Sequence, residues 1–204
     1  MSDTGRAATP LPVRFFARRA DVVAQALLGQ VIASKVGGLR TAGRIVETEA
    51  YLGGEDPASH AFGFRRTDRN RGLFGPHGTW YVYRSYGIHW CANLVCAPRP
   101  AGGAVLLRAL EPIEGIEVMR ERRGGRADRE LCAGPGRLCQ ALGITRALDE
   151  APMASSEVVV LRGEAVPRSR IAATPRIGIT KAAGLELRYT VSGSRWLSAP
   201  IPRR

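Results

Sequence analysis

The stretch R-I-V-E-T-E-A-Y, from Arg44 to Tyr51, decides the fold of this chain. Side chains of a β-strand alternate between the two faces of its sheet. One face of this strand then carries two acids and an aromatic ring, namely Glu47, Glu49 and Tyr51. The other face carries smaller uncharged residues, namely Val46, Thr48 and Ala50. Because buried carboxylates are costly unless paired, the acidic face is either solvated and salt-bridged to arginine or part of a functional site. The tyrosines, histidine and arginines that follow favour the site.

The rest of the chain predicts one α+β domain, with a curved, roll- or barrel-like antiparallel sheet, flanking helices and a protruding β-hairpin. Its 204 residues, 45% of them hydrophobic, suffice for one core. We expect a flexible N-terminal tail over residues 1–12 and the domain over residues 13–204. Sequence patterns predict helices at residues 21–28, 114–122 and 135–142. They predict strands at residues 30–35, 39–51, 79–85, 88–95, 104–110, 158–161, 176–180 and 185–191. Long loops are expected at residues 53–75 and 123–133.

The charge of the chain indicates a polyanionic partner. The formal net charge is +12 and the isoelectric point is about 10.7. Arginines cluster within residues 65–71, 120–129 and 168–176, and clusters beside glycines and aromatics are typical of phosphate contacts. The sequence shows no transmembrane run, signal peptide or long basic amphipathic helix. We therefore expect a cytoplasmic protein that binds nucleic acid rather than a membrane.

The cysteines and histidines do not predict a metal centre. The cysteine spacings, C-x4-C and C-x6-C, match neither a zinc ribbon nor a thioredoxin, at Cys91, Cys96, Cys132 and Cys139. The histidines also lack metal-ligand spacing, at His60, His77 and His89. We expect buried free thiols in a reducing cytoplasm, and neither a metal nor a cofactor.

The segment G-T-W-Y-V-Y-R-S-Y-G, from Gly78 to Gly87, predicts a hairpin with an aromatic residue at its turn. Turns usually place Asn, Asp or Gly there, so Tyr86 has little packing reason to be present. A protruding Tyr86 beside Arg84 is suited to wedging between base pairs, with the arginine near a phosphate. The alternative is that the ring folds back on the hairpin. Tyr83 could stack on a base, whereas we assign Tyr81 to packing within the sheet.

From roughly Phe15 to Trp196, the sequence resembles the alkyladenine (3-methyladenine) DNA glycosylase family. The motifs that carry the resemblance are R-I-V-E-T-E-A-Y-L-G, Ser59-His60, R-N-R-G at residues 69–72, the hairpin segment, L-L-R-A-L-E-P at residues 106–112 and G-P-G-R-L-C-Q-A-L at residues 134–142. The chain departs from the family at Arg195, where members have proline, and in the loop Phe62–Arg66. The resemblance implies a monomeric bacterial enzyme of base excision repair, acting at the nucleoid. Such an enzyme binds the minor groove of duplex DNA, flips out a damaged purine and hydrolyses its N-glycosidic bond.

The resemblance also implies roles for individual residues. Glu49 would be the general base that activates water, which Arg108 and the backbone carbonyl of Ile177 would help to hold. Tyr51 and His60 would line one side of the base pocket and Tyr83 the other. The remaining roles are a purine-edge contact by Asn93, a helix-filling wedge by Tyr86 and phosphate contacts by Arg69, Arg71 and Arg84. A carboxylate suits this chemistry because glycosidic cleavage passes through an oxocarbenium-like sugar.

Two other functions fit parts of the pattern. One is a non-catalytic nucleic-acid-binding protein, since residues 137–145 weakly resemble part of a helix-turn-helix. The other is a metal-dependent nuclease that uses four acids, namely Glu47, Glu49, Glu55 and Asp56. Lysine is scarce, because Lys35 and Lys181 are the only two. Since strand-nicking glycosylases attack the sugar with an amine, we expect a monofunctional enzyme.

Overall fold

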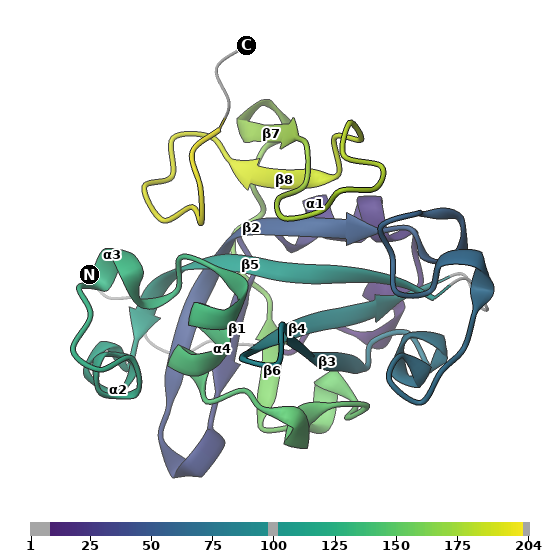
Figure 1. Cartoon of the computed structure of the whole chain (residues 1–204). Helices are drawn as coiled ribbons and strands as arrows, with labels where there is room; N and C mark the ends of the chain where they lie inside the picture. The colour runs from purple at the N-terminus through teal and green to yellow at the C-terminus, as the bar shows by residue number, and fades with distance from the viewer. Residues whose placement is uncertain (1–8, 98–101, 202–204) are drawn as a thin grey trace.

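The computed structural model describes residues 9–97 and 102–201, and in this part of the chain the strands form one open antiparallel sheet (Figure 1). The path runs β3-β4-β5-β2-β1-β6, with β8 also paired to β2 and β7 paired to β8. The strands are β1 (Val31–Ser34), β2 (Thr41–Tyr51), β3 (Trp80–Ser85), β4 (His89–Cys96), β5 (Gly103–Glu114), β6 (Val158–Leu161), β7 (Ile171–Thr174) and β8 (Arg188–Val191). The α+β prediction is confirmed, and the sheet does not close into a barrel.

The helices cover the sheet in two groups. They are α1 (Ala20–Leu27), α2 (Ile116–Arg122), α3 (Asp128–Leu131) and α4 (Pro135–Leu142). Figure 1 shows α1 behind β2, and α2 to α4 grouped at the end of the sheet away from the long loop between β2 and β3. Three helices match their predictions closely, whereas α3 lies inside the predicted loop 123–133. Pro135 starts α4, and Gly143, with φ of 74°, ends it in the left-handed conformation that favours glycine.

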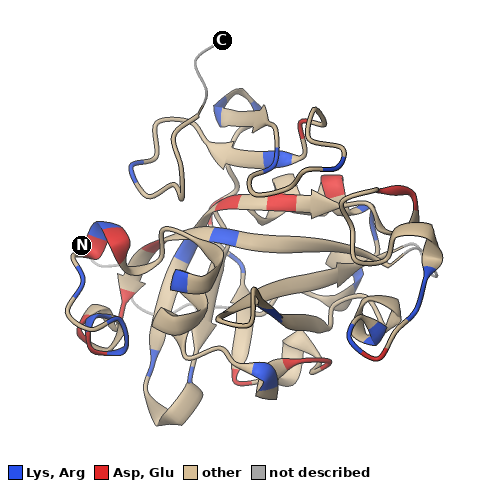
Figure 2. Ribbon diagram, viewed as in Figure 1, with Lys and Arg blue, Asp and Glu red and all other residues tan. Residues whose placement is uncertain are grey.

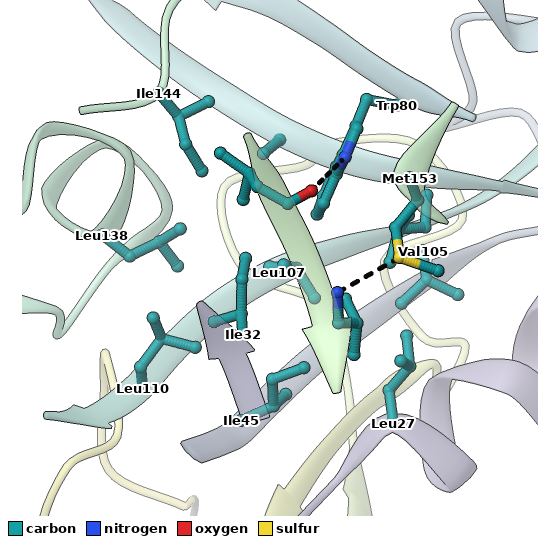
Figure 3. Packing of buried hydrophobic residues seen from close by; sticks show 14 of the residues in the cluster. Leu27, Ile32, Ile45, Trp80, Val105, Leu107, Leu110, Leu138, Ile144 and Met153 are labelled. Atoms are coloured by element: carbon teal, nitrogen blue, oxygen red, sulfur yellow. Dashed lines mark hydrogen bonds between the residues drawn. The ribbon is translucent and has the colours of Figure 1, made fainter. Parts of the chain in front are cut away.

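The main core lies between the sheet and these helices (Figure 3). Trp80, Leu107 and Leu110 are completely buried there, and each such side chain contributes roughly 1.5–3 kcal/mol of burial free energy. The indole nitrogen of Trp80 donates to the carbonyl of Val158 at 3.0 Å, so the ring is buried without an orphaned donor. The hydroxyl of Thr48 donates to the carbonyl of Ala24 in α1 at 2.9 Å. One face of β2 therefore belongs to this core.

The opposite face of β2 is shaped by two of the three irregularities in its pairing with β5. The register shifts between Ile45 and Glu47, and again between Glu47 and Thr48. Val46 consequently packs in a separate cluster with Ala109 and Leu197, so the prediction that it shares a face with Thr48 and Ala50 is wrong. β-Bulges of this kind commonly re-aim a side chain beside an active site.

Two other predictions from the sequence are wrong. Residues 176–180 form no strand, because β7 ends at Thr174 and the chain then turns toward the loop after β2. The predicted flexible tail is too long, because Leu11 is buried and its amide donates to Val160 at 2.8 Å. The remainder of that predicted tail, residues 1–8, lies outside the described residues.

The long loop between β2 and β3 has its own polar scaffold. The side-chain amide of Asn70 donates to the carbonyls of His60 at 2.7 Å and Arg65 at 2.9 Å. Asp56 accepts from the backbone amides of Leu52 and Ala58, each at 3.0 Å. These bonds satisfy backbone groups that a loop would otherwise leave unpaired, and they hold His60 in a fixed place beside the sheet.

Candidate active site

Glu47 and Glu49 lie on the face of β2 that points away from the main core, and both are completely buried. Figure 2 shows acidic positions on β2 between a basic position on β5 and another on β8. These basic residues are Arg108, which is 7% exposed, and Arg188, which is 1% exposed. The register shift leaves Arg108 out of the regular pairing between β2 and β5, and its guanidinium reaches both carboxylates.

Glu49 is held by three donors. The amide of Ile177 donates to Oε1 at 2.7 Å, and the hydroxyl of Tyr51 donates to Oε2 at 2.9 Å. Nη1 of Arg108 lies 3.3 Å from Oε2. Burial, followed by the nearby charge of Glu49, raises the pKa of Tyr51, so its hydroxyl stays protonated as a donor.

Glu47 is held more tightly and by different groups. Its Oε1 accepts from Nε of Arg108 at 3.0 Å and Nε of Arg188 at 2.8 Å. Ser198 donates its backbone amide to Oε2 and its hydroxyl to Oε1, each at 2.6 Å. Burial alone would raise the pKa of Glu47, but the Ser198 bonds and the two guanidiniums together lower it. Glu47 is therefore a fully paired carboxylate.

A cavity of about 630 Å³ lies next to the groups that hold Glu49. Three groups that contact Glu49, namely Tyr51, Arg108 and Ile177, also line the cavity. The other predicted pocket residues line it too, namely His60, Tyr83 and Asn93, together with Arg69 and Tyr86. The structure therefore gathers at one cavity residues that are spread from β2 to the segment after β7.

Aromatic rings form much of the cavity wall. The ring of His60 meets that of Tyr83 edge-on, with centroids 4.6 Å apart, and Tyr83 stacks on Tyr81 at 5.5 Å. The rings of His60 and Tyr83 are therefore in contact, and the grouping of His60 with Tyr51 on one side of a base stays a prediction. Tyr81 packs in the sheet as predicted, but it also lines the cavity and its hydroxyl lies 2.9 Å from Nδ1 of His60.

The electrostatics keep these rings neutral. Although His60 is exposed at the cavity, desolvation by surrounding atoms, followed by the charge of Arg69, lowers its pKa. Its imidazole is therefore uncharged at neutral pH. Burial raises the pKa of Tyr83. The cavity thus offers neutral aromatic faces beside Arg69 and the Arg108–Glu49 ion pair.

Tyr86 projects from the tip of the hairpin with 87% of its surface exposed, so the alternative in which its ring folds back is wrong. Its φ of 50° lies in the left-handed region, which is uncommon for a residue other than glycine. Among the predicted phosphate contacts, Arg69 donates to the carbonyl of Arg84 at 3.3 Å and lines the cavity. Arg71 instead forms an ion pair with Glu150 at 2.7 Å.

Comparison with known proteins decides the family. The methylpurine-DNA glycosylase family matches residues 14–195. The chain belongs to the methylpurine-DNA glycosylase family. It is therefore a hydrolytic DNA N-glycosylase of base excision repair.

Relatives provisionally named 3-methyladenine DNA glycosylase cover nearly the whole chain of this glycosylase. One from Rhodopseudomonas palustris is 49% identical over 95% of this chain and 91% of its own length. One from Burkholderia cenocepacia is 45% identical over 96% of this chain and 94% of its own length. One from Agrobacterium fabrum is 50% identical over 92% of both chains. The resemblance stated from the sequence motifs is thus confirmed.

Several arginines of this glycosylase have structural partners that the sequence did not suggest. Arg176, predicted as part of a phosphate-contacting cluster, is buried in an ion pair with Asp56, with Nη2 2.9 Å from Oδ1. Its guanidinium also lies 4.7 Å from the ring centroid of Tyr51. In the cluster 120–129, Arg122 donates to the carbonyls of Val36 at 2.8 Å and Ala141 at 3.1 Å. The spacing of arginines alone does not distinguish these internal contacts from phosphate contacts.

The acids proposed for a metal-dependent nuclease do not form a cluster. Glu47 is paired with the buried guanidiniums of Arg108 and Arg188, and Asp56 with that of Arg176. Within residues 9–97 and 102–201, no group of three or more His, Cys, Asp or Glu side chains is placed to hold a metal ion. In the same residues, no helix is long and apolar enough to cross a membrane.

Proposed function

We propose that this glycosylase flips an alkylated or deaminated purine out of duplex DNA and hydrolyses its N-glycosidic bond with a water activated by Glu49. The observation that carries the proposal is the position of the Glu49 carboxylate, directly behind a cavity wall made by Tyr51, Arg108 and Ile177. The cavity volume of about 630 Å³ is within the range of small-molecule sites and accommodates a purine base.

The contacts of Glu49 suit a general base that also stabilises positive charge. A carboxylate oxygen has two lone pairs, so a water can bind Glu49 without displacing the amide of Ile177 or the hydroxyl of Tyr51. Arg108 and the carbonyl of Ile177 are the groups that we assign to holding this water. As the glycosidic bond breaks, the ionised carboxylate faces a sugar with oxocarbenium character, and the hydrogen bonds to both of its oxygens fix its direction.

The neutral aromatic wall favours cationic lesions. Alkylated purines such as 3-methyladenine and 7-methylguanine carry positive charge, and the faces of Tyr51 and Tyr83 attract cations. Stacking adds roughly 1–3 kcal/mol per base, which is comparable to the cost of flipping a damaged base. Asn93 is 4% exposed and its amide donates to the carbonyl of Tyr81 at 3.1 Å, so it presents a fixed side chain to the purine edge. We assign to it the discrimination against normal guanine.

The exposed hairpin supplies the contact with the duplex. Tyr86 would fill the gap left by the flipped base from the minor groove, with Arg69 and Arg84 beside it as phosphate contacts. Because one chain carries the complete cavity, the protein is proposed to act as a monomer. Its relatives are bacterial, and we propose that it acts on DNA at the nucleoid of a bacterial cell.

The test is base release from defined duplexes that contain 3-methyladenine, 7-methylguanine, hypoxanthine or ethenoadenine, measured under single-turnover conditions. We expect release of at least the alkylated bases, in the presence of a chelator, with the strand left uncut. A protein that binds these duplexes without releasing any base is a non-catalytic DNA-binding protein. Activity that disappears with the chelator and cuts the strand would favour the nuclease instead.

A further inference from the structure

We propose that Glu47 is a positioning residue that orients the guanidinium of Arg108 toward Glu49. The C-terminal segment Leu197–Ala199 contributes to the same site, because its Ser198 holds Glu47 in place. The inference rests on the proposed role of Glu49 as the base. It assigns a function to a carboxylate that the hydrolysis itself does not use, and to a segment about 150 positions away in sequence.

The guanidinium of Arg108 is shared between the two acids. Its Nε donates to Glu47 at 3.0 Å, while Nη1 faces Glu49 at 3.3 Å. An arginine beside a lone carboxylate tends to form two parallel hydrogen bonds to it. Since Glu47 occupies Nε, Arg108 presents only one edge to Glu49. Oε1 of Glu49, which accepts from the amide of Ile177, then keeps its second lone pair for a water.

Glu47 is itself fixed from the other side. The amide and hydroxyl of Ser198 both donate to it at 2.6 Å, and Arg188 adds a bond at 2.8 Å. Three donors already engage Oε1 of Glu47, and of the groups that contact Glu47 only Arg108 lines the cavity, whereas Tyr51, Arg108 and Ile177, which contact Glu49, all line it. It is therefore suited to positioning and unsuited to being the base.

The C-terminal segment is anchored at each of its residues. The carbonyl of Leu197 accepts from Arg129 at 2.9 Å, and the carbonyl of Ala199 accepts from Arg188 at 2.7 Å. The side chain of Leu197 is buried with Val46 and Ala109, next to the register shift that frees Arg108. The segment thus holds Ser198 beside Glu47, and the hydrogen bonds at Leu197 and Ala199 fix the backbone on either side of Ser198.

The experiment compares Glu47→Gln with the wild type in single-turnover base release and in equilibrium binding of lesion duplex. We expect the rate to fall about 100-fold, as for a misplaced group near the chemistry, with lesion binding within twofold of wild type. The same substitution is then made in an Arg108→Lys background, because an ammonium cannot bridge the two carboxylates as the guanidinium does. If Glu47 acts through Arg108, adding Glu47→Gln to Arg108→Lys lowers the rate of base release by less than a further threefold.

Controls separate this inference from general damage and from the proposed function. Glu111→Gln removes a carboxylate of β5 that pairs with Arg44 of β2 outside the site, and it should leave the rate unchanged. If Glu47→Gln does not fold, Ser198→Ala removes only one hydroxyl and should lower the rate about tenfold. A wild-type rate in the folded variant, or losses that multiply fully with Arg108→Lys, would overturn the positioning role. Retained activity in Glu49→Gln would instead overturn the proposed function.

Discussion

Replacing Glu49 by glutamine tests the centre of the proposed mechanism. The amide keeps the size of the side chain, and its oxygen can still accept from the backbone amide of Ile177, where Oε1 now does so at 2.7 Å. Its NH2 group then takes the place of Oε2, 3.3 Å from Nη1 of Arg108, so that two donors face each other. The variant loses the base and the negative charge, and it gains one unfavourable contact, while the lining of the cavity stays the same.

The expected loss in single-turnover base release is at least about 1,000-fold. General base catalysis typically contributes 10²–10⁴-fold, and loss of the charge opposite the developing oxocarbenium adds to it. A 1,000-fold loss corresponds to about 4 kcal/mol of transition-state stabilisation. Lesion binding should remain close to wild type, because the stacking rings and the phosphate contacts are untouched. A rate within tenfold of wild type for Glu49→Gln, together with a greater loss for Glu47→Gln, would show that Glu47 is the base.

Three further predictions test other parts of the molecule. Tyr86→Ser should weaken lesion-specific binding about tenfold or more, from lost stacking, but not salt-dependent binding to undamaged duplex; an equal loss of both would mean that Tyr86 only stabilises the hairpin. Asp56→Asn leaves the buried guanidinium of Arg176 without its anion and should cost about 3–5 kcal/mol in urea unfolding, whereas a cost below 1 kcal/mol contradicts a buried ion pair. Borohydride should trap no covalent adduct with lesion duplex, because Lys35 and Lys181 are exposed and do not line the cavity; an adduct lost in Lys181→Ala would refute the water mechanism.

The Asp56–Arg176 pair also gives a pH dependence with a defined sign. Burial would raise the pKa of Asp56, but the hydrogen bonds from Arg176, Leu52 and Ala58 lower it. A carboxyl group with a depressed pKa in the folded state contributes stability that is present above its unfolded value of about 3.9 and is lost as the pH falls through its folded value. Acid unfolding should therefore be shallower in Asp56→Asn than in the wild type. Parallel curves would mean that Asp56 does not contribute to the acid sensitivity.

Contacts between residues of one strand of this site follow from the sequence, whereas contacts between residues far apart in the chain do not. Alternation along β2 placed Glu47, Glu49 and Tyr51 together because a strand has a fixed period of two. The same rule failed at Val46, since a bulge depends on the pairing with β5 and leaves no signature in one strand alone. Arg176 could not be identified as buried, because arginine is rarely buried unless paired and its partner Asp56 is 120 positions away.

The distribution of buried charge connects the fold to the chemistry. Within the described residues, the buried ionisable side chains of Asp, Glu and Arg are three acids and three arginines, namely Glu47, Glu49, Asp56, Arg108, Arg176 and Arg188. All of them lie in two linked groups of contacts that meet at Glu49 and Tyr51. Apolar residues of similar volume are often at least as stabilising as buried ion pairs, and the main core of this protein is indeed apolar. The charges are therefore best explained by preorganisation, since fixed dipoles and ions around a base need no rearrangement when charge develops on the sugar. By this argument the Asp56–Arg176 pair, which supports the ring of Tyr51 and the start of the Ile177 segment, serves the same site from its other side.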